Sequence, residues 1–416
     1  MTYEDSETIL ALILDIGVAM MRSGAETHRV EDSLYRLCDS YGFRACNIWA
    51  IPSNIQASVE TEDGRHLTQI RHIRQVSFHY ELLDRLNNLC REACATVPDA
   101  GTLKKRFRLV SKVAPEPMWR HYLGGILGAV GFGFFFNCDL LDALTAFLVA
   151  IIITFLCLAL SKREENPLIV NFIISFFAEL FIICAVHFGL GHHQSYITIG
   201  AVMLLISGAG ATNGIRDIIH LDTLSGTINV TSSMTGAIGI ALGIAVPIRL
   251  LAGWSSSDAY MVNPNLLVQL ISCTAAAKGF AMWFHVRRGH VVLCSLGAFI
   301  SWAAYLLAAA FMGTGFSSAV CCAVVCGFYA QIVARIKKTP VTIFSSICIF
   351  PLIPGSSLYY MMAALVTQEN RLALEHGITL FATCFAIVLG NMAVEVVSRH
   401  IWKQPKPGVS ISFREI

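Results

Sequence analysis

The sequence predicts an α-helical integral membrane protein that carries a small α+β domain at its N-terminal end. Two observations predict this fold class. The first is composition: of 416 residues, 55% are hydrophobic and 14% are charged, whereas charged residues make up about 25% of an average soluble domain. The second is distribution, because fifteen of the 30 Lys and Arg residues fall within the first 120 positions and long apolar segments fill the rest.

Residues 1–115 have the pattern of a soluble cytoplasmic domain. A helix is expected first, because Ile9, Leu12, Ile13 and Ile16 repeat at helical spacing. Acidic residues precede this run and no small-residue cleavage site follows it, which argues against a secretory signal. The elements expected in this domain are helices over 6–22, 26–41, 80–95 and 102–112, with strands within 43–60 and 66–73.

From Trp119 onward, ten segments each approach the roughly 20 residues that a helix needs to cross a bilayer core. They are expected at about 119–137, 140–160, 167–188, 195–213, 224–248, 264–285, 290–311, 317–334, 341–365 and 375–397. This part of the chain therefore predicts about ten transmembrane helices.

The cations that connect these segments are distributed unequally between the two sides of the membrane. With residues 1–115 in the cytoplasm, the cytoplasmic connections and the C-terminal tail carry twelve of the fifteen Lys and Arg residues that follow position 120. The opposite side carries two, Arg249 and Arg371, and Lys278 lies inside a span. By the positive-inside rule, this asymmetry predicts an even number of spans with both termini inside. We expect a multi-pass protein of a bacterial cytoplasmic (inner) membrane.

The membrane part divides into two halves, 116–255 and 256–416, whose fourth segments resemble each other. One ends "MLLISGAGATN" and the other contains "IFPLIPGSSLYY", so each has an apolar run, a Gly-containing break and then polar residues. Five segments per half is an odd number, so the two five-helix repeats should be inverted relative to each other. Inverted repeats with interrupted helices at matching positions are a recurrent transporter design, with the solute near the middle of the bilayer.

The first break, "SGAGATNGIRDIIHLDTLSG", is a candidate solute site. Non-helical backbone persists within a membrane only where protein buries it or water reaches it, and glycines let a ligand approach the main chain. An arginine here can pair with a carboxylate, and an aspartate with an ammonium group. The candidate binding residues are Gly208, Gly210, Thr212, Asn213, Arg216, Asp217 and Asp222. The alternative is a cytoplasmic loop whose arginine follows the positive-inside rule.

The second break, "PLIPGSSLYY", combines two prolines with hydroxyl side chains. Prolines remove backbone donors and disfavour a regular helix, while the serines and tyrosines can hydrogen-bond a solute. The candidate binding residues are Pro354, Gly355, Ser356 and Tyr359. The alternative is a kinked helix with tyrosines at the membrane interface.

Two carboxylates fall within the predicted spans. Glu179 has about eight residues of its span on either side, where an ionised side chain is costly, so Glu179 is the candidate for proton coupling. Glu395 lies near a cytoplasmic end, and pairing with Arg399, four residues on, explains it without a function. Lys278 either reaches the interface or pairs inside the bundle.

In the soluble domain, "RSGAETHRVEDSLYRL" is the distinctive stretch. Ser23 and Glu26 have the spacing of a capping box that starts the second helix, which leaves Arg29 and Glu31 for a site or a domain contact. The sequence shows no Ser-His-Asp spacing, nucleophile elbow or phosphate loop, so no catalytic residue is expected. The 14 cysteines form no metal-ligand spacing, so neither a metal site nor a cofactor is expected.

These stretches together resemble the threonine/serine exporter family. A Ser-Gly-Ala…Arg-Val-Glu pattern occupies 23–31, a Thr-Asn…Arg-Asp…Asp…Ser-Gly pattern occupies 212–226, and "KTPVT…PLxPGSxLYY" occupies 338–360. The resemblance extends over nearly the whole chain. One departure is Ser207, where the family often has proline.

The resemblance implies a ten-span secondary transporter that exports threonine, serine or similar solutes, driven by the proton gradient or the membrane potential. Some family members are linked to dicarboxylate export, and for succinate Arg216 and Lys278 would bind the solute instead. The implied partners are a small-molecule solute and membrane lipid. A homodimer is compatible with a bundle of this size, and no nucleic acid is expected. Two further classes stay open: a membrane-anchored enzyme or sensor acting through 1–115, and a channel.

Overall fold

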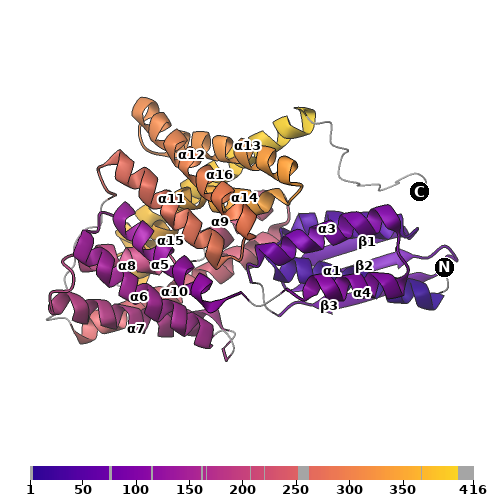
Figure 1. The fold of residues 1–416 in the computed structure, drawn as a ribbon, viewed down its shortest axis with the longest axis horizontal. Coiled ribbons are helices and arrows are strands. Elements are labelled where there is room, and N and C mark those ends of the chain that lie inside the picture. The colour runs from indigo at the N-terminus through magenta and orange to yellow at the C-terminus, as the bar shows by residue number, and fades with distance from the viewer. Residues whose placement is uncertain are drawn as a thin grey trace. The chain divides into compact units, whose positions relative to one another are not determined.

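A computed structural model describes residues 3–74, 77–113, 116–160, 163–164, 166–206, 208–219, 221–251, 262–366 and 368–401. Within these ranges the chain is mostly helical, with one three-stranded sheet in its N-terminal part (Figure 1). The chain forms two compact units. The first contains Met1–Pro115, Lys337–Thr342 and Glu395–Ile416, and the second contains Glu116–Ile336 and Ile343–Val394.

The first unit is built on an α+β domain. Its elements are α1 (Tyr3–Arg22), α2 (Thr27–Ser40), β1 (Arg44–Ile51), β2 (Asn54–Glu60), β3 (His66–His72), α3 (Tyr80–Thr96) and α4 (Ala100–Ser111). These bounds confirm the four helices and both strand-forming stretches expected within 1–115. The central strand β2 pairs antiparallel with both neighbours. It buries Ile55, Ala57 and Val59 on one face, as the alternation of a pleated strand requires.

The capping box expected at the start of α2 is wrong. Ser23 belongs to the end of α1, because its hydroxyl donates to the Ala19 carbonyl at 2.7 Å. Glu26 occupies the N-cap position of α2, and its side chain caps no backbone amide. Gly24 between them has a φ of +88°, the left-handed conformation that commonly follows the end of a helix.

The second unit consists of helices, three of which have one end that belongs to the first unit. They are α5 (Met118–Phe135), α6 (Leu140–Leu160), α7 (Pro167–His187), α8 (Gln194–Val202), α9 (Gly208–Ile219), α10 (Thr223–Leu250), α11 (Leu266–Trp283), α12 (Arg288–Met312), α13 (Phe316–Lys337), α14 (Val341–Cys348), the short 3-10 helix η1 (Phe350–Leu352), α15 (Gly355–Val366) and α16 (Asn370–Ile401). Each of the ten segments expected after Trp119 is occupied by helix, and the two fourth segments are each split.

Most of these helices have the length and composition of membrane spans. Among the described residues, seven qualify (α6, α7, α10, α11, α12, α13 and α16), and the bent pair from α14 to α15 makes an eighth if it is one span. Large apolar side chains of these helices, such as Phe155 and Phe177, are about half exposed, as expected of helices that face lipid. The protein is therefore a multi-pass membrane protein. The count stays below the expected ten because α5 contains Arg120 and five glycines, and α8 and α9 are short.

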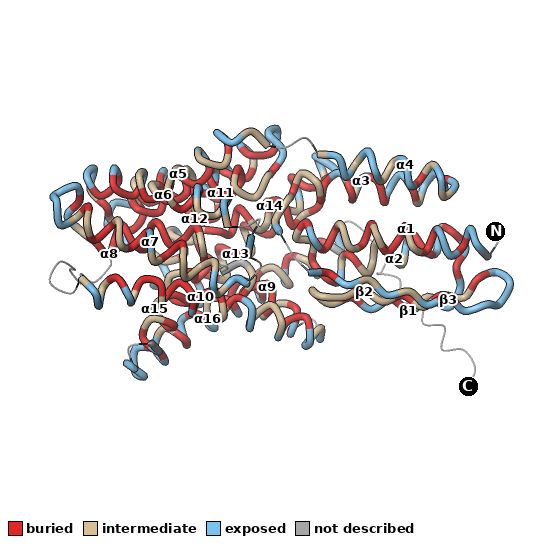
Figure 2. Tube along the Cα trace, turned by 90° about the horizontal axis from the view of Figure 1, so that it is seen from below, coloured by how far each residue is buried: buried red, intermediate tan, exposed pale blue. Residues whose placement is uncertain are grey.

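Glycines let the helices of this unit pack closely. Where α5 meets α11, a Cβ built on Gly131 would lie 2.8 Å from the backbone nitrogen of Ala276, and one built on Gly279 would lie 2.6 Å from the Gly124 oxygen. Small residues permit such an approach of backbones in membrane proteins. Figure 2 shows a buried and an exposed side along the long helices of the unit.

Candidate functional site

Two helices of the second unit are interrupted. α8 ends at Val202 and α9 begins at Gly208, with a turn over 203–206 between them, and α14, η1 and α15 follow one another with a bend of 46°. Pro351 and Pro354 explain the second interruption, because a proline cannot donate a backbone hydrogen bond. The second split coincides with the Pro- and Gly-containing break in the sequence, and the first split comes just before the other Gly-containing break.

The first interruption lies earlier in the chain than the sequence predicts. Gly208, Gly210, Thr212, Asn213, Arg216 and Asp217 all belong to α9, and Asp222 is the N-cap residue of α10. The expectation of non-helical backbone over Gly208–Asn213 is wrong, as is the alternative of a loop around Arg216. Packing explains the difference, because a Cβ built on Gly214 would meet the Gly226 oxygen of α10 at 2.8 Å. Ser207 lies outside the described residues.

The two interruptions lie against each other inside the unit. A Cβ built on Gly355, at the start of α15, would lie 3.0 Å from the Met203 sulfur and 3.3 Å from the Ile206 side chain. Pro354 and Gly355 are buried there, and Ser356 is half-buried. The start of one half-helix therefore meets the turn that follows the other.

A buried carboxylate lies beside the first interrupted helix. Glu179, on α7, is 1% exposed. Gln194 Nε2 donates to its Oε1 at 2.6 Å, and Thr198 Oγ1 donates to its Oε2 at 2.8 Å. Both donors are uncharged side chains on α8, so these contacts orient the carboxylate without supplying a positive charge.

Tyr359 connects the second interrupted helix to the same carboxylate. Its side chain, on α15, is 8% exposed and lies within electrostatic range of Glu179. The structure thus places these two predicted site residues within electrostatic range of each other. Gln194 and Thr198 were not predicted; their i,i+4 spacing, which puts two polar residues on one face of an apolar helix, was the available signal.

The polar residues of α9 make a different set of contacts. Asp217 is 8% exposed and accepts a hydrogen bond from Asn229 Nδ2 of α10 at 3.1 Å. The Thr212 hydroxyl lies 3.6 Å from the Cys384 sulfur of α16. The contacts of α9 therefore lead to α10 and α16, whereas those of the buried carboxylate lead to α8 and α15.

The motif of the α+β domain makes contacts within the first unit. Glu31 accepts a hydrogen bond from a β1 backbone amide at 2.7 Å. Glu26 is 9% exposed and accepts one bond from Arg29 Nε at 3.3 Å and another from the Thr342 hydroxyl at 2.9 Å. Thr342 ends the segment Lys337–Thr342, which clusters with this unit. The family patterns at 23–31 and 338–360 are therefore in contact here, and this contact stabilises the first unit.

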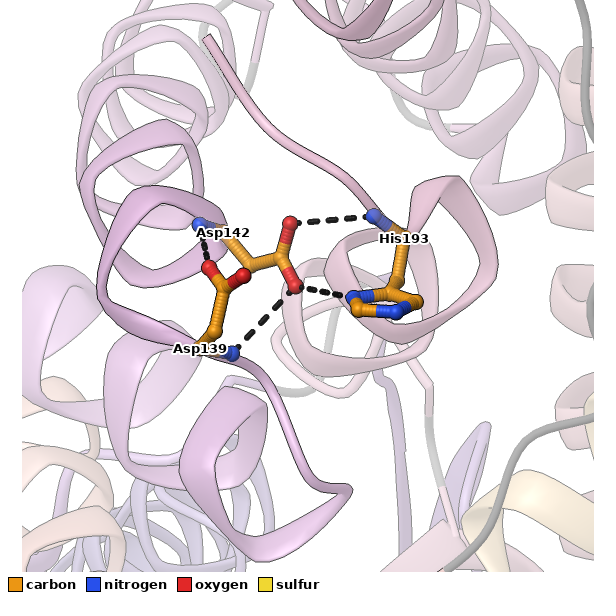
Figure 3. Close-up of side chains that lie close together, drawn as sticks. All are labelled: Asp139, Asp142 and His193. Atoms are coloured by element: carbon orange, nitrogen blue, oxygen red, sulfur yellow. Dashed lines mark hydrogen bonds and ion pairs between the residues drawn. The ribbon is translucent and has the colours of Figure 1, made fainter.

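A second polar cluster lies where α5 leads into α6 and α7 leads into α8. Asp139, Asp142 and His193 each place one potential ligand atom within 4.8 Å of the others (Figure 3). His192 Nδ1 lies 2.5 Å from Asp139 Oδ2, and this hydrogen bond, followed by the charge of Asp139, raises the pKa of His192. The sequence did not predict this cluster, because the paired side chains are about 50 positions apart.

Interrupted helices that meet beside a buried carboxylate, in a bundle with an apolar outer surface, are the features of a membrane transporter. The chain belongs to the threonine/serine exporter family. One threonine/serine exporter family model matches residues 11–251, and another, described as "Threonine/Serine exporter, ThrE", matches residues 269–397. The "Threonine/serine exporter" of Corynebacterium glutamicum is 19% identical over 416 residues, which covers 96% of this chain and 84% of that protein. No solved structure matches the chain.

These matches confirm the family resemblance that the three sequence patterns suggested. One match includes the soluble-domain motif and the first break, and the other includes the second break. Because the family is one of exporters, the protein is a transporter and not an enzyme anchored to the membrane.

Proposed function

We propose that this protein is a proton-coupled secondary transporter that exports threonine, serine or similar small polar amino acids by alternating access. The observation that carries this proposal is the position of Glu179, buried beside α8 and near Tyr359 of α15. A carboxylate at such a depth in a membrane protein is costly and is usually functional. If it holds either a proton or the ammonium group of the solute, each displaces the other, and this exchange couples the two fluxes.

The carboxylate of the solute has its natural place at the starts of the two half-helices. The first amides of a helix have no partner within it and carry partial positive charge, and interrupted helices in transporters use these ends to bind anionic groups. In this protein they are the amides near Gly208 and Gly210 of α9 and near Gly355 and Ser356 of α15. Asp217 is a second candidate for the ammonium group.

The proposal includes ten spans in two inverted repeats, 116–255 and 256–416. Each half contributes five helical segments, of which the fourth is interrupted. Similar close contacts join the third and fifth segments of each half. A Cβ built on Gly243 would lie 2.6 Å from the Phe172 oxygen, and one built on Gly390 would lie 3.0 Å from the Val320 oxygen. The distribution of cations supports cytoplasmic termini in a bacterial inner membrane.

Export of a dicarboxylate is the alternative, and its recognition requires cations. Arg216 is half-buried on α9, but Lys278 is exposed on the outside of α11. An exposed lysine in a membrane helix extends to the interface, so it does not supply a second interior charge. Threonine or serine is therefore the better-supported solute.

The first experiment is transport into proteoliposomes that contain the purified protein. Labelled threonine and labelled succinate are supplied side by side under an imposed pH gradient. We expect threonine to accumulate and the accumulation to disappear when a protonophore collapses the gradient. If succinate alone accumulates, the solute is a dicarboxylate and proton coupling still holds. If threonine equilibrates without accumulating, the protein is a channel.

Deleting residues 1–110 tests whether transport needs the soluble domain. We expect the truncated chain to retain measurable threonine transport, because every residue assigned to the solute site lies in the second unit. Transport is compared with that of the full chain at equal amounts of monodisperse protein. A folded, truncated protein without any threonine flux would contradict this expectation and place an essential step in the soluble domain.

A further inference from the structure

We propose that Asp139, Asp142 and His193, with His192 beside Asp139, form a binding site for one divalent transition-metal ion of the zinc type. Asp139 precedes α6 and Asp142 lies in its first turn, while both histidines immediately precede α8. Figure 3 shows three of the side chains turned toward one another. The site is separate from the solute site, and the inference does not depend on which solute is exported.

Backbone amides orient the two carboxylates. Asp142 Oδ1 accepts hydrogen bonds from the amides of His192 and His193 at 2.7 and 3.0 Å. Asp139 Oδ1 accepts bonds from the amides of Leu141 and Asp142 at 2.9 and 2.8 Å. In each carboxylate the other oxygen, Oδ2, faces a histidine Nδ1. Hydrogen bonds of this kind are what hold metal-binding carboxylates in position.

The two carboxylates have only imidazoles as ion-pair partners among the described residues. Asp139 pairs with His192 and Asp142 pairs with His193. The Asp142 side chain is fully buried. A divalent ion would bring two positive charges to these two carboxylates.

The distances suit a tetrahedral ion. Zn²⁺ lies about 2.0–2.2 Å from nitrogen and oxygen ligands, so its ligand atoms are about 3.3–3.6 Å apart. The His193–Asp142 pair is at 2.9 Å, and the ligand atoms of the three residues all lie within 4.8 Å of one another. Side-chain rotations that bring these atoms to the tetrahedral spacing would complete the site. Mixed nitrogen and oxygen ligands select zinc-like ions over Mg²⁺ or Ca²⁺, which prefer oxygen.

An ion at this location would affect the position of α8. His193 is the N-cap residue of α8, and the next residue, Gln194, donates to Glu179. An ion that joins His193 to Asp139 and Asp142 at the start of α6 therefore fixes the start of α8. The same ion would hold Gln194 in position on the buried carboxylate.

Titration with Zn²⁺ tests the proposal. The full-length protein, purified in detergent and stripped of metal with EDTA, is titrated with Zn²⁺ by calorimetry in a buffer that contains millimolar Mg²⁺. Amide hydrogen exchange is then followed with and without Zn²⁺. We expect one Zn²⁺ per chain, unaffected by Mg²⁺, and slower exchange over 138–142 and 189–194. His193→Gln and Asp139→Asn should each weaken Zn²⁺ binding by at least about tenfold.

His187→Gln is the matched control. His187 is an exposed histidine at the end of α7, in ring contact with Phe188, so its replacement should leave Zn²⁺ affinity unchanged. Failure of the wild-type protein to bind Zn²⁺, or equal affinity in His193→Gln and Asp139→Asn, would overturn the proposal. Asp142 is not replaced, because its carboxylate also accepts hydrogen bonds from the backbone amides just before α8. A loss of Zn²⁺ binding in such a variant would not distinguish misfolding from the loss of a ligand.

Discussion

Replacement of Glu179 by glutamine is expected to abolish proton-coupled transport while leaving the fold intact. A proton that moves through 100 mV supplies about 2.3 kcal/mol, enough for a roughly fiftyfold solute gradient. Without a group that gains and loses a proton, the variant cannot couple threonine to the proton gradient, so the accumulation ratio should fall from that range to about one. The measurement is steady-state accumulation in proteoliposomes at several imposed pH gradients.

The fold should tolerate this change because glutamine matches the shape of the carboxylate. Gln194 Nε2 can still donate to the amide oxygen at 179. The Thr198 hydroxyl, which donates to Glu179 in the wild type, can rotate and accept a hydrogen bond from the new amide group. Both polar contacts with α8 are therefore preserved, and a loss of accumulation reports on the proton rather than on α8.

Glu375→Gln is the control for removing a carboxylate as such. Glu375 is exposed on α16 and pairs with Arg371 at 3.1 Å, so its replacement should not change accumulation. A Glu179→Gln protein whose accumulation follows the pH gradient as in the wild type would remove Glu179 from the coupling mechanism.

The elements of the α+β domain and the second interruption were predictable because local residue patterns determine them. Apolar positions at helical spacing predicted the first helix, and strand-like composition predicted strands within 43–60 and 66–73. Pro351 and Pro354 disfavour a regular helix through their own backbone, whatever the helix packs against. The exact end of the first interruption was not predictable. A run of glycines is compatible with helix or turn, and contact of Gly214 with α10 favours the helix.

The surroundings of the site depend on contacts between distant segments, which a single sequence does not contain. Glu179 stood out by its burial in an apolar run, but its partners on α8 become visible only when the helices pack. The capping box failed for a related reason: Ser23 had a nearer acceptor, the Ala19 carbonyl at the end of its own helix. A short motif predicts a contact only when no competing partner lies closer.

Gly200→Ala is expected to destabilise the protein by about 1–3 kcal/mol and to reduce transport, as overpacking of a tight contact does. A Cβ built on Gly200 of α8 would lie 2.8 Å from the nitrogen and 2.9 Å from the Cα of Gly133, and 3.1 Å from the Ala129 oxygen. All three atoms belong to the backbone of α5, so no side chain can rotate away. α8 would have to move as a whole, and Gln194 and Thr198 would leave Glu179.

Thermal unfolding of the purified protein, detected by size-exclusion chromatography, measures the loss of stability. Threonine accumulation is measured for the same variant. The matched control is Gly289→Ala in the first turn of α12, where an added Cβ meets no atom within 4 Å, so this variant should keep at least the wild-type stability. Since alanine favours helix at both positions, only the approach of α5 makes the two variants differ. Equal melting temperatures for the two variants would show that α8 does not pack on α5 through Gly200, and the placement of Gln194 and Thr198 beside Glu179 would lose its support.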